Sequence, residues 1–247
     1  SARIPHEALE RRAGQHRPLG MSFSLDRQVN HAQRGSGARS RAHWESVFNR
    51  VQPFVRGMVL YVAAFLCAMA SYLVWGPALK RGALGLLGLA LAVHTAGLAA
   101  RMFLQGRPPV TNLYSSAVFV GWAGALLGLV AERVHRRGFA AAGACALGFI
   151  TLLVAHHLTS SGDTMEMMRA VLDSNFWLAT HVVTVTIGYS STFLAGALAA
   201  AWIIRRHALR RPDPEASKAL LSLVYGVICF SLIFSFIGTV LGGIWAD

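Results

Sequence analysis

The chain has 247 residues, of which 54% are hydrophobic and 14% are charged, with a mean hydropathy of +0.47. Soluble globular domains carry about 25% charged residues, so this composition excludes both an ordinary water-facing surface and a disordered chain. The formal net charge of +12 leaves nucleic acid or a membrane surface as the partner, and the positions of the charges must decide between them.

Residues 1–56 form a polar, basic tail with ten Arg and four acidic residues and without a sustained apolar period. This composition predicts a mostly disordered segment, with a short amphipathic helix around residues 44–55. We expect no secretory signal peptide, because an apolar segment is missing from the beginning, and Met21 is a candidate for the natural start.

Six apolar stretches follow the tail, and each approaches or exceeds the roughly 20 residues that a helix needs to cross a bilayer. We expect spans near 57–78, 82–104, 113–131, 138–157, 175–204 and 219–246. Backbone polar groups in lipid must be satisfied within the segment itself. The sequence therefore predicts an all-α fold, a polytopic transmembrane helical bundle over residues 57–247.

The remaining Lys and Arg residues are mostly gathered in short clusters between the apolar stretches, at 80–81, 133–137 and 205–211. This pattern is typical of loops that flank membrane spans, and no RNP-like, zinc-finger or helix-turn-helix signature supports nucleic-acid binding. The positive-inside rule puts these clusters on the cytoplasmic side, and loops 101–112 and 158–174 with both termini on the external side. The basic tail opposes this orientation, but long tails count for less than short loops.

Three cysteines, Cys67, Cys145 and Cys229, each lie inside an apolar stretch and outside any CxxC pair. A zinc site or a thioredoxin-type redox motif is therefore not expected. The sequence also lacks CxxCH, so this chain does not attach c-type haem to itself.

His94 lies near the middle of the second expected span, and Arg101 follows seven residues later on about the same face. Ionisable residues within spans usually have a functional or structural reason. His94 is either a ligand for a metal or haem, a proton relay, or a neutral histidine hydrogen-bonded to a neighbouring helix. The last interpretation is favoured, because one histidine without a partner is a weak signal.

His181 lies about one and a half turns into the fifth expected span, close to the external surface. Gly188 and Ser191 fall near the same helix face, and Gly188 leaves room for either a flat ligand or a closely packed helix. A neutral imidazole here is suited to bind haem iron axially. On spacing alone, a histidine packed in the protein core is an equally good interpretation.

Two stretches together resemble one family. RMFLQGRPPVTNLYSS (101–116) is similar to the R-W-x-x-x-G-x-x-P-x-S-N-L-Y-E-S segment of the CcsA/ResC cytochrome c biogenesis proteins. MRAVLDSNFWLATHV (168–182), followed by Ile187-Gly188-Tyr189, is similar to their P-A-L-Q-S-x-W-L-x-x-H-V…G-Y segment. The resemblance covers roughly residues 57–247, and the order and separation of the two segments also agree.

The resemblance implies a membrane protein of the bacterial inner (cytoplasmic) membrane that delivers haem b, as a transferred substrate, to the external face. There it would help to attach haem to a CxxCH apocytochrome c as part of a haem lyase, together with a ResB/CcsB-like membrane partner. By the motif match, His181 corresponds to an external axial haem ligand. His94 does not align with a known ligand.

The sequence also departs from the family. Ser115 stands where the family usually has Glu, which weakens the charge of that loop. Gly242-Gly243-Ile244-Trp245 resembles the approach to the tryptophan-rich haem-binding segment, so Trp245 is expected to begin the haem platform. The W-G-x-x-W-x-W-D core and the later histidines are absent, which implies a truncated polypeptide that is inactive alone.

Two other classes of protein remain as alternatives. A multi-pass transporter or scaffold without haem chemistry would have polar groups converging at the midplane, where His94 is the one candidate. A b-type electron carrier would need paired histidines on facing helices, and His94 and His181 are expected at different depths.

Overall fold

The computed structural model describes residues 43–74, 76–159, 174–208 and 213–246. The chain divides into two compact units, residues 1–50 and 51–247. Every regular element within the described ranges is a helix, so the predicted all-α fold is confirmed. The expected disorder of the tail falls mostly on residues 1–42, outside the described ranges. The short helix expected near 44–55 covers residues 43–51, and Gln52 follows it with a φ of 45°.

Six of the helices in the described ranges are long and apolar enough to cross a membrane, which confirms the predicted multi-pass bundle. The segments of the second unit are α3 (Pro53–Val74), α4 (Pro77–Gln105), α5 (Leu113–His135), α6 (Phe139–Thr159), α7 (Asn175–Trp177), η1 (Leu178–Val182), α8 (Val183–Ile203), η2 (Ile204–Ala208) and α9 (Pro214–Ala246). Several helices extend past the apolar stretches, since hydropathy marks the part of a helix suited to lipid and says little about where the helix ends.

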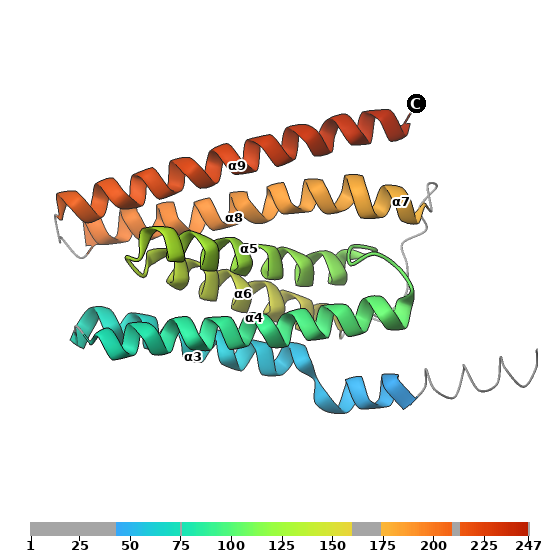
Figure 1. Ribbon diagram of the computed structural model, residues 1–247, viewed down its shortest axis with the longest axis horizontal. Coiled ribbons are helices and arrows are strands. Elements are labelled where there is room, and N and C mark those ends of the chain that lie inside the picture. Colours follow the sequence, from blue (N-terminus) through green and yellow to red (C-terminus); the bar gives the residue numbers. More distant parts are fainter. Residues whose placement is uncertain (1–42, 75, 160–173, 209–212, 247) are drawn as a thin grey trace, which may run out of the picture. The chain divides into compact units, whose positions relative to one another are not determined.

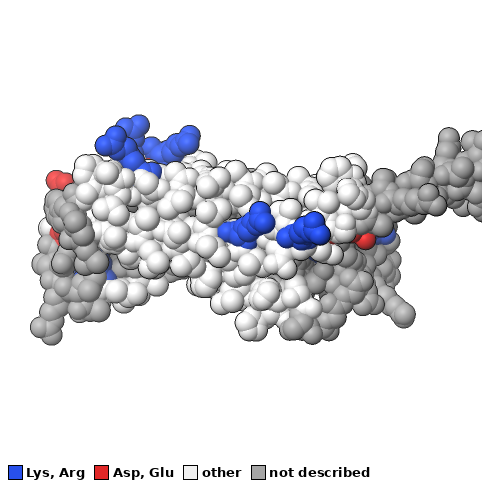
Figure 2. All heavy atoms as spheres, turned by 90° about the horizontal axis from the view of Figure 1, so that it is seen from below, with Lys and Arg blue, Asp and Glu red and all other residues white. Residues whose placement is uncertain are grey.

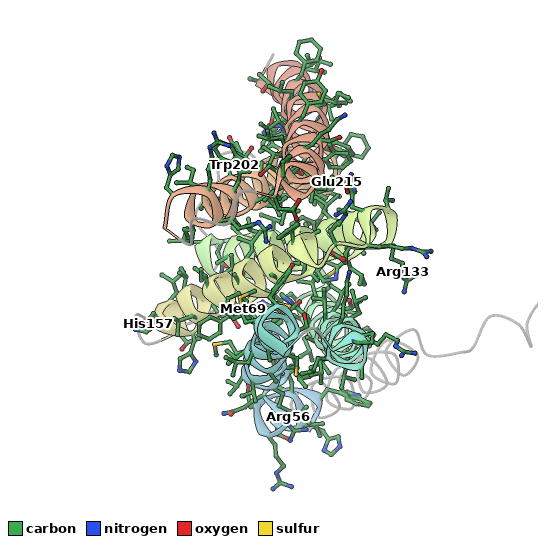
Figure 3. All side chains as sticks on the ribbon, turned by 90° about the vertical axis from the view of Figure 1, so that its left-hand side faces the viewer. Arg56, Met69, Arg133, His157, Trp202 and Glu215 are labelled. Atoms are coloured by element: carbon green, nitrogen blue, oxygen red, sulfur yellow. The ribbon has the colours of Figure 1, made fainter. Side chains whose placement is uncertain are left out.

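The helices of the second unit pack as three pairs (Figure 1). α5 and α6 form the middle pair, with α3 and α4 on one side and α8 and α9 on the other, as the end-on view also shows (Figure 3). Leucine side chains of α6, α8 and α9 fill one contact region, including Leu147, Leu194 and Leu220. Ala68 and Ala142 lie in the contact between α3 and α6, where small residues let membrane helices approach closely.

The loop between α4 and α5 is fixed at both ends by helix caps. α4 ends at Gly106, which has a φ of 63° and donates its N–H to the carbonyl of Met102. α5 begins with a capping box: the Asn112 side chain accepts from the Ser115 N–H, and the Ser115 hydroxyl accepts from the Asn112 N–H. Glu often occupies this third helical position in such boxes, so Ser115 performs a capping role that the family's Glu is also suited to fill.

The opposite end of the bundle brings the basic clusters together. Lys80 donates to the carbonyl of Arg136 in the α5–α6 turn, and the Arg205 guanidinium lies 5.3 Å from the centre of the Phe139 ring. Arg137 pairs with Glu215 at 3.7 Å, which adds the start of α9 to this end. The face shown in Figure 2 is mostly uncharged, with its Lys and Arg side chains in a few groups. The basic residues at 210 and 211 lie outside the described ranges.

Candidate functional site

His181 lies in η1, a single π-helical turn between α7 and α8. π-Helical turns inside α-helices are frequent at functional sites, because the extra residue per turn redirects the side chains. The ring of His181 is half-buried and directed at α9, at the end of the bundle away from the basic clusters. Most of the expected external loop at 158–174 lies outside the described ranges.

A hydrogen bond to α9 determines which nitrogen of the His181 ring carries the proton. Its Nδ1 lies 2.7 Å from the carbonyl oxygen of Gly238. A carbonyl can only accept, so Nδ1 carries the proton and the lone pair of the neutral ring is on Nε2. Metal-ligating histidines typically donate their second N–H in this way, which sets the tautomer and raises the basicity of the ligating nitrogen. The ring is therefore prepared to act as a ligand through Nε2.

Two tryptophans lie beside this imidazole. The Trp245 ring centre is 5.7 Å from that of His181, and Trp177 stacks on Trp245 with 6.3 Å between centres and 20° between planes. Both indoles are partly exposed. Trp177 is four residues before His181 and thus on the same helix face. The result is a flat aromatic surface next to a potential iron ligand.

Close packing of α8 on α9 decides the role of Gly188. A Cβ atom built there would lie 2.5 Å from the Ser235 hydroxyl oxygen and 3.0 Å from the Ser235 backbone nitrogen. The sequence allowed either a flat ligand or a closely packed helix beside Gly188, and the structure shows the closely packed helix. Ser231 of α9 strengthens the contact by donating to the Gly188 carbonyl at 2.9 Å.

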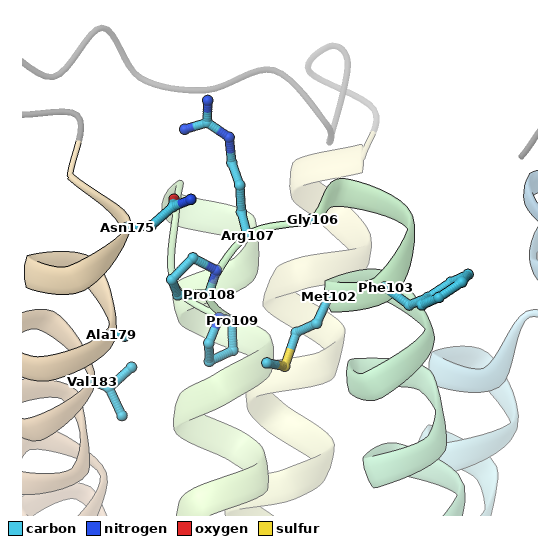
Figure 4. Close-up of a pocket in the computed structure, with 9 residues that line it drawn as sticks. All are labelled: Met102, Phe103, Gly106, Arg107, Pro108, Pro109, Asn175, Ala179 and Val183. Carbon is cyan, nitrogen blue, oxygen red and sulfur yellow. The ribbon is translucent and has the colours of Figure 1, made fainter. Parts of the chain in front are cut away.

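The two sequence segments that carried the family resemblance line one groove of about 640 Å³ (Figure 4). Met102, Pro108 and Pro109 come from the first segment, and Asn175 and Ala179 come from the second. Ala179 precedes His181 by two residues, so it lies on roughly the opposite face of the helix. The groove and the His181 ring therefore use different sides of α7–α8.

His94 has the surroundings of a packed histidine. It is fully buried, its Nδ1 is 3.2 Å from the Tyr61 hydroxyl, and the rings of Phe54 and Tyr61 meet it edge-on. Arg101 is buried too, with its guanidinium carbon 4.4 Å from the centre of the Tyr114 ring. These contacts support the interpretation of His94 as a hydrogen-bonded helix contact, and its weaker candidacy as a haem ligand stays a prediction.

The structure brings His181 and Trp245 together and leaves His94 in the separate contact between α3, α4 and α5. Within the described residues, no three His, Cys, Asp or Glu side chains gather into a metal-binding group. Sequence analysis missed Trp177, Gly238 and Gly242. The four-residue spacing between Trp177 and His181 could have identified Trp177 from the sequence. The roles of the two glycines depend on how α9 packs against η1, which the sequence does not show.

Comparisons with known proteins identify a family that matches much of the chain. Residues 110–247 match the family described as cytochrome C assembly protein. Protein NrfI of Wolinella succinogenes is 30% identical over 221 residues, which cover 85% of this chain and 24% of NrfI. The cytochrome c biogenesis protein CcsA of a Synechococcus species is 24% identical over 195 residues, 66% of this chain and 62% of that protein. CcsA of a Synechocystis species is 32% identical over 131 residues, 51% of this chain and 38% of that protein.

The chain thus spans less than two thirds of the length of each of these three relatives. The family match, however, covers more than half of the chain and includes α5 to α9, with His181 and both tryptophans of the site. The chain belongs to the cytochrome c assembly protein family, and it is a multi-pass membrane protein of the CcsA type with a role in cytochrome c biogenesis.

Proposed function

We propose that the chain delivers haem b to the external face of the bacterial inner membrane and helps to attach it to a CxxCH apocytochrome c. Haem is the substrate, and His181 holds its iron axially through Nε2. The observation that carries this proposal is the 2.7 Å contact of His181 Nδ1 with the Gly238 carbonyl, because it puts the ring lone pair on Nε2.

Trp245 and Trp177 support the same assignment. Their stacked indoles offer an apolar, flat surface beside the imidazole, which suits the face or edge of a porphyrin. Trp245 is accordingly the proposed beginning of the haem platform.

The proposed reaction needs little covalent chemistry from this chain. Each apocytochrome thiol adds across one haem vinyl group: sulfur bonds to the carbon next to the porphyrin, and the thiol hydrogen ends on the terminal carbon. The addition loses no atoms and is neutral in oxidation state. Iron held by His181, with the porphyrin resting against the two indoles, would keep the vinyl groups within reach of the two thiols, so proximity and orientation supply most of the rate enhancement. The chain would thus act as a component of a haem lyase.

The proposed orientation follows from the two ends of the bundle. Lys80, Arg136, Arg137 and Arg205 gather at one end, which the positive-inside rule assigns to the cytoplasm. His181 lies toward the other end and would face the external side. The proposed partners are apocytochrome c, membrane lipid and a ResB/CcsB-like membrane protein.

The test is substitution of His181→Gly in the full-length protein, with His156→Gly, an exposed histidine at the end of α6, as the matched control. We expect haem that copurifies with the protein and the yield of holocytochrome to fall, and to recover when imidazole is added. The control should retain both. Unchanged haem content in His181→Gly, with or without imidazole, would remove the ligand assignment.

A further inference from the structure

One face of α9 is built around the His181 ring. Gly238, Gly242 and Trp245 are spaced by four and three residues, so they lie on the same side of the helix. Gly238 supplies a carbonyl to Nδ1, Gly242 lies against the ring, and Trp245 lies beside it. Three successive turns of α9 therefore contact one side chain of the preceding helix.

Gly238 allows the two backbones to approach each other. A Cβ atom at this position would lie 2.5 Å from Val185 Cγ2 and 2.9 Å from the Val185 backbone nitrogen. Backbone atoms cannot move aside as the tip of a side chain can, so any larger residue must push α9 away from α8. That displacement would lengthen the bond between the Gly238 carbonyl and His181 Nδ1.

Gly242 makes room for the ring itself. A Cβ atom at this position would lie 2.6 Å from His181 Cε1, 3.0 Å from Nδ1 and 3.1 Å from Nε2. The three atoms nearest to this point all belong to the imidazole. A side chain at position 242 would therefore turn or displace the ring, and it would also approach the Nε2 atom that carries the lone pair.

We infer that Gly238 and Gly242 are positioning residues for His181: the first fixes its tautomer through the backbone carbonyl, and the second fixes the direction of Nε2. The inference rests on the proposed haem role of His181. The two glycines act through the histidine and do not themselves bind iron. Outer partners of this kind typically change metal affinity by about 10–100-fold when they are altered.

The chain offers matched controls for both positions. Gly226 and Gly243 lie on the same helix, and nothing would be within 4 Å of a Cβ atom at either position. Four variants of the full-length protein in lipid nanodiscs are compared: Gly238→Ala, Gly242→Ala, Gly226→Ala and Gly243→Ala. Haem b and iron-free protoporphyrin IX are titrated separately, because the iron-free ring reports contacts with the aromatic surface and not the axial bond.

We expect haem affinity to fall about 10–100-fold in Gly238→Ala and Gly242→Ala and to stay unchanged in the two controls. Protoporphyrin IX should bind Gly242→Ala and the two controls equally, because the atoms nearest to the methyl group added at 242 belong to the His181 ring. In Gly238→Ala the loss of haem affinity should exceed any loss of protoporphyrin IX affinity, since the displaced α9 also carries Trp245. In haem-free protein, histidine ¹⁵N spectra should show His181, identified by the signal lost in His181→Gly, with protonated Nδ1 and unprotonated Nε2. Gly238→Ala should show a mixture of both tautomers, whereas Gly226→Ala and Gly243→Ala on the same helix should keep the Nδ1-protonated form.

Failure of the inference and failure of the proposed function give different results. If His181→Gly loses haem while Gly238→Ala and Gly242→Ala bind haem like the controls, the positioning role is wrong and the haem site stands. If His181→Gly binds haem as the unaltered protein does, the proposed function itself fails. Should Gly238→Ala not fold, Gly242→Ala decides, since the atoms nearest to its added methyl group all belong to the His181 ring.

Discussion

Glu132 illustrates how single residues are stabilised at the ends of this bundle. Glu132 is 1% exposed, and its carboxylate accepts hydrogen bonds from the backbone N–H groups of Gly138 and Ala141. These N–H groups belong to the start of α6, where the helix leaves donors without partners and carries partial positive charge. The buried charge is therefore matched by the helix end that it caps.

Replacing Glu132 should destabilise the protein measurably. Glu132→Ala removes the acceptor for both N–H groups, and hydrogen bonds to charged groups contribute about 1.5–3 kcal/mol. Glu132→Gln keeps one acceptor oxygen and should lose less. Equilibrium unfolding in mixed detergent micelles measures the change, with the exposed neighbour in Arg133→Gln as the control. Equal stability of Glu132→Ala and the control would contradict this role.

At the scale of elements, the start of α5 determines the shape of the loop before it. The Asn112–Ser115 capping box holds the first turn, and the same loop brings Pro108 and Pro109 to the groove beside α7. Thr111 and Asn112 both stand just before α5, and both are residue types that can cap a helix. The structure selects Asn112, because its side-chain oxygen reaches the Ser115 N–H at 2.8 Å.

Asn112→Ala should lower the free energy of unfolding by about 1 kcal/mol, the usual effect of losing an N-cap side chain. Asn112→Asp keeps an oxygen acceptor and should remain within about 0.5 kcal/mol of the unaltered protein, since both residues are strong N-caps. The same unfolding measurement compares the two variants. A larger loss for Asp than for Ala would show that the cap does not control this turn.

At the scale of the whole molecule, the orientation of the bundle can be measured directly. In a background without the three native cysteines, Arg107→Cys should react with a membrane-impermeant maleimide in intact cells. Arg136→Cys should react in inverted membrane vesicles, because the two residues lie at opposite ends of α5. The reverse labelling pattern would invert the assignment made from the positive-inside rule.

The sequence by itself determined the class of fold, the number of spans and the segment that contains His181. Hydropathy and charge are local properties, so a window of residues carries enough information to mark a helix suited to lipid. The sequence was less informative about helix ends and gave no indication of the π-helical turn at η1, since both depend on contacts with neighbouring helices.

Only the tertiary structure decided which helix faces meet. The His181 ring and its carbonyl partner Gly238 are 57 residues apart, and nothing in either local segment specifies that pairing. The same is true of the hydrogen bond between Tyr61 and His94. It is also true of Gly188, where the space left by the absent side chain is occupied by α9 and not by a ligand. Such contacts arise when whole helices pack, because each pairing depends on the rotation, separation and register of two elements at once.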